Sequence, residues 1–202
     1  MPCSLASWAR HRDQPAQART RQANTGALGR HRHEFPALGP HVKESARSNR
    51  EFMHRATRHL SNLGIAQFLD IRIDIPTQPN LHQIVQHPTP TARVVYVGND
   101  PIVLRHAQAL LRETPEGHLA YLHADIRDPE QILTHTLEHL DFTQPIGLSL
   151  VALMHFVTDD QHPCRIIEKL LEPLVPGSHL TLSHLITEDP KNVKRVDAIY
   201  RT

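Results

Sequence analysis

The amino-acid sequence predicts an α/β fold, a doubly wound parallel sheet of about five strands. Apolar runs of roughly four to eight residues alternate with amphipathic segments of about ten, which is typical of βαβ units. The apolar runs are continuous, as expected for strands that are covered on both faces of a sheet. Right-handed crossovers between such strands place helices on both sides of the sheet.

Five segments have the composition of buried strands. They are residues 67–71, 94–97, 120–124, 146–154 and 179–185. The fourth, from Ile146 to Met154, is the longest apolar run of the chain and about half the length needed to cross a bilayer.

Helices are predicted between these strands from apolar spacing and capping residues. Apolar residues step by threes and fours through residues 42–63, up to Gly64. Asn80 caps a short helix, and Asp100 and Asp128 each precede a proline, the pair that starts a helix. The last helix begins at Pro163. The apolar positions of these helices, among them Leu63, Ile102 and Leu137, are predicted to face the sheet.

The first 33 residues differ from the rest of the chain. They hold six arginines and one aspartate, a formal charge of +5, and few large apolar residues. We therefore predict a disordered basic leader over residues 1–33 and a domain over residues 34–202. The domain is mildly acidic, which argues against nucleic-acid binding. Without a secretory h-region or a bilayer-length apolar run, the expected location is cytoplasmic, with no membrane partner.

In an open α/β sheet, ligands bind beyond the carboxyl ends of the strands, where the winding reverses. The polar residues that stand at or just after strand ends are Asp70, Asp100, Asp125 and His155. His155 is the candidate general base, because histidine titrates near physiological pH. Asp100 has an alternative interpretation as the cap of the helix that starts at Pro101.

Six blocks of sequence carry a family resemblance. They are N-R-E-F, F-L-D-I-R-I-D-I-P-T-Q-P-N-L-H-Q, R-V-V-Y-V-G-N-D-P-I-V-L, A-Y-L-H-A-D-I-R-D-P, L-V-A-L-M-H-F-V-T-D-D and L-V-P-G-S-H-L-T-L-S-H. Over about residues 34–200 they resemble the actinobacterial S-adenosyl methyltransferase family, once catalogued as a domain of unknown function. The resemblance implies a class I, Rossmann-like methyltransferase that uses S-adenosyl-L-methionine to methylate a small-molecule acceptor.

The resemblance also implies roles for the candidate residues. Asp70 would stand beside the cofactor loop, and Asp125 with Ile126 would face the adenine. His155 and its neighbour would lie where the acceptor binds. The ribose-binding acid of the family falls at Gly98, so Asp100 is the nearest carboxylate that could replace it.

Three departures from the family pattern suggest an alternative, a catalytically inactive remnant or binding module. The family loop reads D-h-G-x-G, whereas this chain has Arg72 and Asp74 at the two glycine positions. The ribose carboxylate is missing at Gly98. The chain also ends at Thr202, so we expect the sheet to lack the final antiparallel pair and to expose an edge for homo-oligomer formation.

A minor alternative is a zinc peptidase, because His135, Glu138 and His139 form an H-x-x-E-H pattern. Histidines four residues apart on a helix share a face. The pattern lies away from the strand ends where sites form, and Leu137 between the histidines is expected to face the sheet. We therefore predict no metal.

Overall fold

The computed structural model describes residues 41–71, 78–110 and 114–184. The strands are β1 (Gln67–Ile71), β2 (Arg93–Gly98), β3 (His118–His123), β4 (Gly147–Leu150) and β5 (His179–Leu182). The helices are α2 (His41–Asn62), α3 (Leu81–Gln86), α4 (Pro101–Leu110), α5 (Pro129–Thr136) and α6 (Pro163–Leu171). Two short 3-10 helices, η2 (Met154–Phe156) and η3 (Asp159–Gln161), follow β4.

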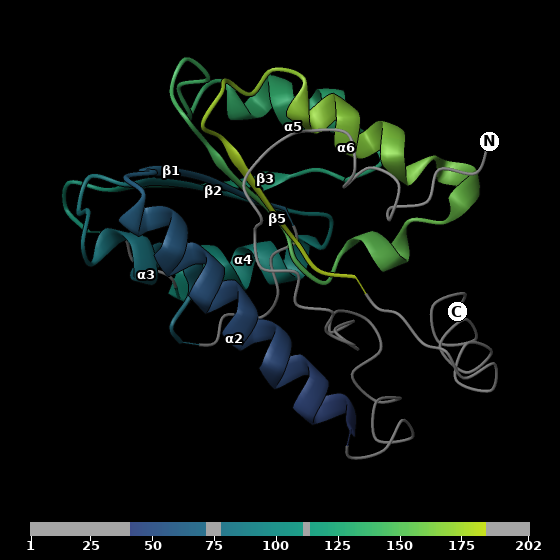
Figure 1. The fold of residues 1–202 in the computed structure, drawn as a ribbon, viewed down its shortest axis with the longest axis horizontal. Helices are drawn as coiled ribbons and strands as arrows, with labels where there is room; N and C mark the ends of the chain where they lie inside the picture. The colour runs from purple at the N-terminus through teal and green to yellow at the C-terminus, as the bar shows by residue number, and fades with distance from the viewer. Residues whose placement is uncertain (1–40, 72–77, 111–113, 185–202) are drawn as a thin grey trace.

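The described sheet has five strands, all parallel, in the order β3-β2-β1-β4-β5. The winding reverses between β1 and β4, so the switch point lies at the carboxyl ends of these two strands. Helices α2, α3 and α4 lie on one side of the sheet and α5 and α6 on the other (Figure 1). The predicted doubly wound α/β fold is confirmed.

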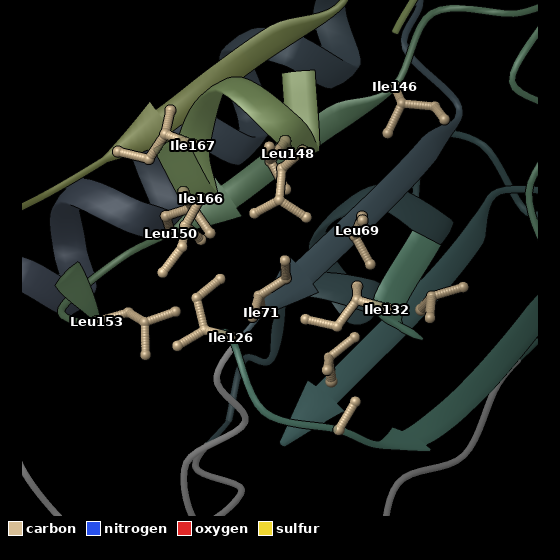
Figure 2. Close-up of a cluster of buried hydrophobic side chains, with 14 of the residues drawn as sticks. Leu69, Ile71, Ile126, Ile132, Ile146, Leu148, Leu150, Leu153, Ile166 and Ile167 are labelled. Atoms are coloured by element: carbon tan, nitrogen blue, oxygen red, sulfur yellow. The ribbon is translucent and has the colours of Figure 1, made fainter. Parts of the chain in front are cut away.

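Each face of the sheet packs its own hydrophobic core, because successive residues of a strand point to opposite faces. Leu69, Leu148 and Leu150 pack against Ile132 of α5 and Ile166 of α6 (Figure 2). On the other face, the core is formed by Phe68, Val94, Leu60, Leu81 and Ala107, the last three from α2, α3 and α4. The two cores hold the strand ends at fixed relative positions, which is what a site at the sheet edge needs.

One row of the sheet is polar across all five strands. Tyr121, Tyr96, Asp70, Ser149 and Thr181 are partners in register from β3 to β5. Residues in register on parallel strands point to the same face, and Tyr96 packs in the core beneath α2 and α3. The row therefore forms a polar layer between the sheet and these helices, close to the carboxyl edge.

The fourth strand is shorter than predicted. β4 ends at Leu150 rather than Met154, because residues 151–153 form a turn and Met154 begins a 3-10 helix. These residues are as apolar as a strand because they are buried: Ala152, Leu153 and Met154 are at most 8% exposed. The fifth strand was predicted to continue to residue 185, and the structure ends it at Leu182.

Three apolar residues predicted to face the sheet are exposed, and this prediction is wrong. Leu63, Ile102 and Leu137 are 57%, 67% and 61% accessible. Leu63 follows the end of α2, and Leu137 is the C-cap of α5, so neither lies within a helix. Ile102 lies just beside the inward face of α4, which is formed by Val103, Leu104 and Ala107.

The predicted leader and the predicted lack of a closing antiparallel pair both fall outside the described residues. Within the described ranges, no helix combines the length and the apolar character that crossing a bilayer would require.

Candidate functional site at the carboxyl edge of the sheet

Asp70 lies in the polar row, next to the last residue of β1. It is half-buried and stands in register with Tyr96 of β2 and Ser149 of β4. The Tyr96 hydroxyl accepts a hydrogen bond from the His82 backbone N–H at 3.0 Å and lies 3.0 Å from His82 Nδ1. Burial, and then the nearby Asp70 carboxylate, raise the pKa of Tyr96 well above its usual 10. The phenol is therefore neutral, and Asp70 stands beside it at this end of β1.

Asp125 follows β3 and is fixed by its own neighbours. Its Oδ1 accepts from the Arg127 backbone N–H at 2.9 Å and from Arg127 Nε at 2.8 Å. Its Oδ2 accepts from Arg127 Nη2 and, at 3.4 Å, from Asn99 Nδ2. The hydrogen bonds from Arg127 lower the pKa of Asp125 from its usual 3.8 to about 2. A carboxylate has about four acceptor positions, so the long Asn99 bond is the one that an incoming donor would replace.

Asp100 caps the helix that starts beside it. Its Oδ1 accepts from the backbone N–H groups of Ile102 at 2.8 Å and Val103 at 3.3 Å. The alternative interpretation of this residue as a helix cap is therefore confirmed. Its other carboxylate oxygen accepts no hydrogen bond from the described residues.

Ile126 packs in the core rather than facing solvent. Its side chain is 8% exposed and belongs to the cluster beneath α5 and α6, together with Leu153 beyond β4 (Figure 2). Only its backbone is left to meet a ligand. The side chains of Ile126 and Leu153 connect the β3 and β4 ends of the edge through the core.

A buried hydrogen-bond chain fixes the exit of β4. The backbone N–H of Ala152 donates to Ser183 Oγ at 2.9 Å, and Ser183 Oγ donates to Asn49 Oδ1 of α2 at 2.6 Å. Asn49 and Ser183 are 6% and 8% exposed. Ala152 has a left-handed φ of 55°, which costs a residue with a Cβ about 1–2 kcal/mol. Asn49 was not among the predicted site residues, although it lies in one of the six family-like blocks.

His155 lies in η2, three residues beyond Ala152. Its ring centroid is 4.4 Å from that of Phe156 and 5.9 Å from that of His184, which meets it edge-on. All three residues are half-buried, and both ring nitrogens of His155 are shielded from solvent. The structure therefore brings the two histidines that follow β4 and β5 together, on the opposite side of the switch point from Asp125.

The residues of the H-x-x-E-H pattern do not share a helical face. α5 ends at Thr136, so His135 lies on the helix and His139 in the following turn. His139 Nδ1 is instead 3.1 Å from Nε2 of His118, and the two rings stack at 5.3 Å. The predicted helical arrangement is wrong because the helix stops one turn early. Over the described ranges, no group of three or more metal-ligating side chains comes together.

In doubly wound α/β proteins, ligands bind beyond the carboxyl ends of the strands at the switch point, and polar side chains follow the strands of this sheet at that edge. The sequence profile of the family described as S-adenosyl methyltransferase matches residues 27–202, so the chain belongs to this family. S-adenosylmethionine is the cofactor after which the family is named. The match begins at residue 27, inside the segment predicted as a leader.

Two crystal structures are similar to this chain. A DUF574 family protein from Streptomyces avermitilis is 48% identical, with a TM-score of 0.72, over 77% of this chain and 61% of that one. A methyltransferase candidate from Thermobifida fusca is 38% identical, with a TM-score of 0.71, over 80% of this chain and 61% of that one. The chain thus spans about three-fifths of the length of these relatives. No curated protein matches it significantly.

Proposed function

We propose that this chain binds S-adenosyl-L-methionine at the switch point and transfers its methyl group to a small-molecule acceptor. The observation that best supports this is the position of Asp125 and His155 on the two sides of one sheet edge in a member of this family. The first is a fixed, ionised acceptor, and the second is a half-buried imidazole.

The residues around the edge have the chemistry that the cofactor needs. Asp125 Oδ2 would accept a hydrogen bond from the adenine amino group in place of the bond from Asn99, with the Ile126 backbone beside it. The second carboxylate oxygen of Asp100 would accept a hydrogen bond from a ribose hydroxyl, while the first oxygen continues to cap α4. Asp70 would stand where the chain enters the loop that follows β1.

The cofactor supplies an electrophilic methyl group on a sulfonium sulfur, and the protein supplies position and a dry environment. His155 would take the proton that the acceptor N–H or O–H loses as its bond to the methyl carbon forms and the carbon–sulfur bond breaks, which would leave the demethylated cofactor. The rings of Phe156 and His184 flank it and would keep water away from the acceptor side.

Calorimetric titration of S-adenosylmethionine and of its demethylated product into the purified chain tests the proposal. We expect micromolar binding and a matching rise of the melting temperature. Asp125→Asn should weaken binding about tenfold or more, because it removes a charged acceptor. Asp128→Asn is the matched control: it makes the same charge change three residues away and keeps an N-cap oxygen for Gln131 N. A folded chain that binds neither ligand would overturn the proposal.

The second candidate is a family member that no longer binds the cofactor. It is favoured by Arg72 and Asp74 at the glycine positions of the loop, and by Gly98 in place of the ribose acid. Both loop residues lie outside the described ranges. If the wild-type chain does not bind, the Arg72→Gly/Asp74→Gly variant should distinguish the causes. Binding by this variant would mean that only the loop is lost, and no binding would favour a non-catalytic role.

A further inference from the structure

Helix α2 contacts both sides of the switch point through neighbouring residues. On the β1 side, Arg50 Nη2 and His54 Nε2 donate to the Pro79 carbonyl oxygen at 3.4 and 2.9 Å. On the β4–β5 side, Asn49 accepts from Ser183 at 2.6 Å. One helix therefore connects the segment that leads into α3 with the segments that leave β4 and β5.

The direction of the Asn49–Ser183–Ala152 chain follows from its atoms. The Ala152 backbone N–H can only donate, so Ser183 Oγ is its acceptor. The hydroxyl proton of Ser183 is then available for a hydrogen bond, which it donates to Asn49 Oδ1. Because Asn49 and Ser183 are at most 8% exposed, water does not substitute readily for either bond.

The hydrogen-bond chain ends at Ala152, whose backbone is in the left-handed region. Ala152 is one of two non-glycine residues with a positive φ in the described part, and it is the middle residue of the turn over 151–153 that leads into η2. Such a conformation persists only where the surrounding structure holds it. The backbone N–H of Phe156 then donates a hydrogen bond to the carbonyl oxygen of Leu153 at 3.0 Å, which closes the next turn around His155.

We propose that Asn49 is a positioning residue for the acceptor side of the site. Through Ser183 it holds the left-handed turn at Ala152, and that turn sets where the His155 ring lies. The role of His155 as a general base rests on the proposed function. The effect of α2 on the position of the His155 ring does not. Helix α2, which precedes the sheet, and Ser183, which follows β5, are thus both part of the site.

A purely structural role for Asn49 would have a different signature. Loss of a buried hydrogen bond that only supports the fold raises amide exchange throughout the cooperative unit. Loss of a positioning bond raises exchange more in the segment that it holds than in distant helices, and it changes the environment of the His155 ring.

The experiment compares four full-length variants by amide hydrogen exchange and by NMR of the histidine ring carbons. Asn49→Leu and Ser183→Ala each remove one link of the chain. Asn49→Asp keeps an acceptor oxygen for the Ser183 hydroxyl. Ser61→Ala is the matched control, since Ser61 is a buried serine of the same helix, 9% exposed, outside the chain. The His155 ring signal is assigned by its loss in His155→Gln.

We expect Asn49→Leu and Ser183→Ala to speed exchange over residues 151–157 about tenfold or more and to shift the His155 signal. Exchange in α4 should rise only by the factor that the measured loss of global stability accounts for, and exchange over residues 151–157 should exceed that factor. Asn49→Asp should stay within about threefold of wild type, and Ser61→Ala should leave both readouts as they are. If folded Ser183→Ala keeps wild-type exchange and an unshifted His155 signal, the proposal is wrong.

Titration with the demethylated cofactor separates this inference from the proposed function. If the wild type binds no cofactor but the Asn49→Leu and Ser183→Ala variants still change exchange and the His155 signal, the proposed function is wrong and the positioning role stands. If the wild type binds the cofactor but the His155 signal is the same in Asn49→Leu and Ser183→Ala as in the wild type, the proposed function stands and the positioning role is wrong.

Discussion

The two sides of the switch point are stabilised in opposite ways. After β2 and β3, Asp100 and Asp125 bond mainly to residues two or three positions along the chain, apart from one long bond from Asn99 to Asp125, and both carboxylates are half-exposed. After β4 and β5, the bonds join residues 31 and 134 positions apart, and their side chains are buried. The first side is a set of local motifs that water can reach. The second depends on the packing of the whole fold.

This difference has an energetic consequence. A half-exposed local bond exchanges readily for a bond to water, so its loss costs little. A buried bond that loses one partner leaves the other without a substitute and costs more. We therefore expect the loss of a polar side chain to reduce stability more on the β4–β5 side than on the β2–β3 side. Apolar residues that enter the core are a separate case, because their loss is costly on either side.

The largest effect should come from the residue on the β2–β3 side that enters the core. Ile126→Ala removes a side chain that is 8% exposed and should lower the free energy of unfolding by about 3 kcal/mol. Urea unfolding measures this change. Ile102→Ala is the matched control: this isoleucine is 67% exposed, and the cost should stay below about 0.5 kcal/mol. Equal effects of the two variants would contradict the assignment of Ile126 to the core.

Ser183→Ala tests the β4–β5 side. The variant removes the hydroxyl that links Ala152 N–H to Asn49 and leaves a buried donor and a buried acceptor unsatisfied. We expect a loss of about 2–3 kcal/mol in the free energy of unfolding, measured in urea. Ser61→Ala, at a buried serine without this network, should cost clearly less. A loss under about 0.5 kcal/mol would mean that water reaches the network.

The local side of the edge could be predicted from the sequence, and the long-range side could not. Asp-Pro pairs identify the starts of α4 and α5 because capping involves residues within one turn. The end of β4 is not visible in the sequence, because a buried turn and a buried strand are equally apolar. The place of Asn49 in the site depends on α2 lying against β5, which only the tertiary fold decides.

The Asp100 cap should have a smaller effect than either of these. Asp100→Ala removes the acceptor for two backbone N–H groups at the start of α4 and should cost about 1 kcal/mol. Asp100→Asn keeps a capping oxygen and should cost less than about 0.5 kcal/mol. Thermal unfolding of the two variants side by side measures the difference. If they destabilise equally, the charge of Asp100 matters and its capping bonds do not.

The smallest effect should be the pH dependence that Asp125 contributes. Its pKa is lowered from 3.8 to about 2 by Arg127, so the unfolded chain binds the proton more readily than the folded one. The stabilisation is complete above about pH 5 and is lost as the pH falls through 2. Because the Arg127 side chain is 55% exposed, solvent screening limits it to about 1 kcal/mol or less.

Melting temperatures from pH 6 to pH 2 compare the wild type with Asp125→Asn. The variant has no carboxylate to protonate at this position, so its melting temperature should fall less steeply below pH 4. Asp128→Asn keeps the Asp125–Arg127 pair and should follow the wild-type slope. Parallel curves for the wild type and Asp125→Asn would mean that Arg127 does not hold this carboxylate in solution. The β2–β3 side would then present an open acceptor to the cofactor rather than one that must first give up a bond.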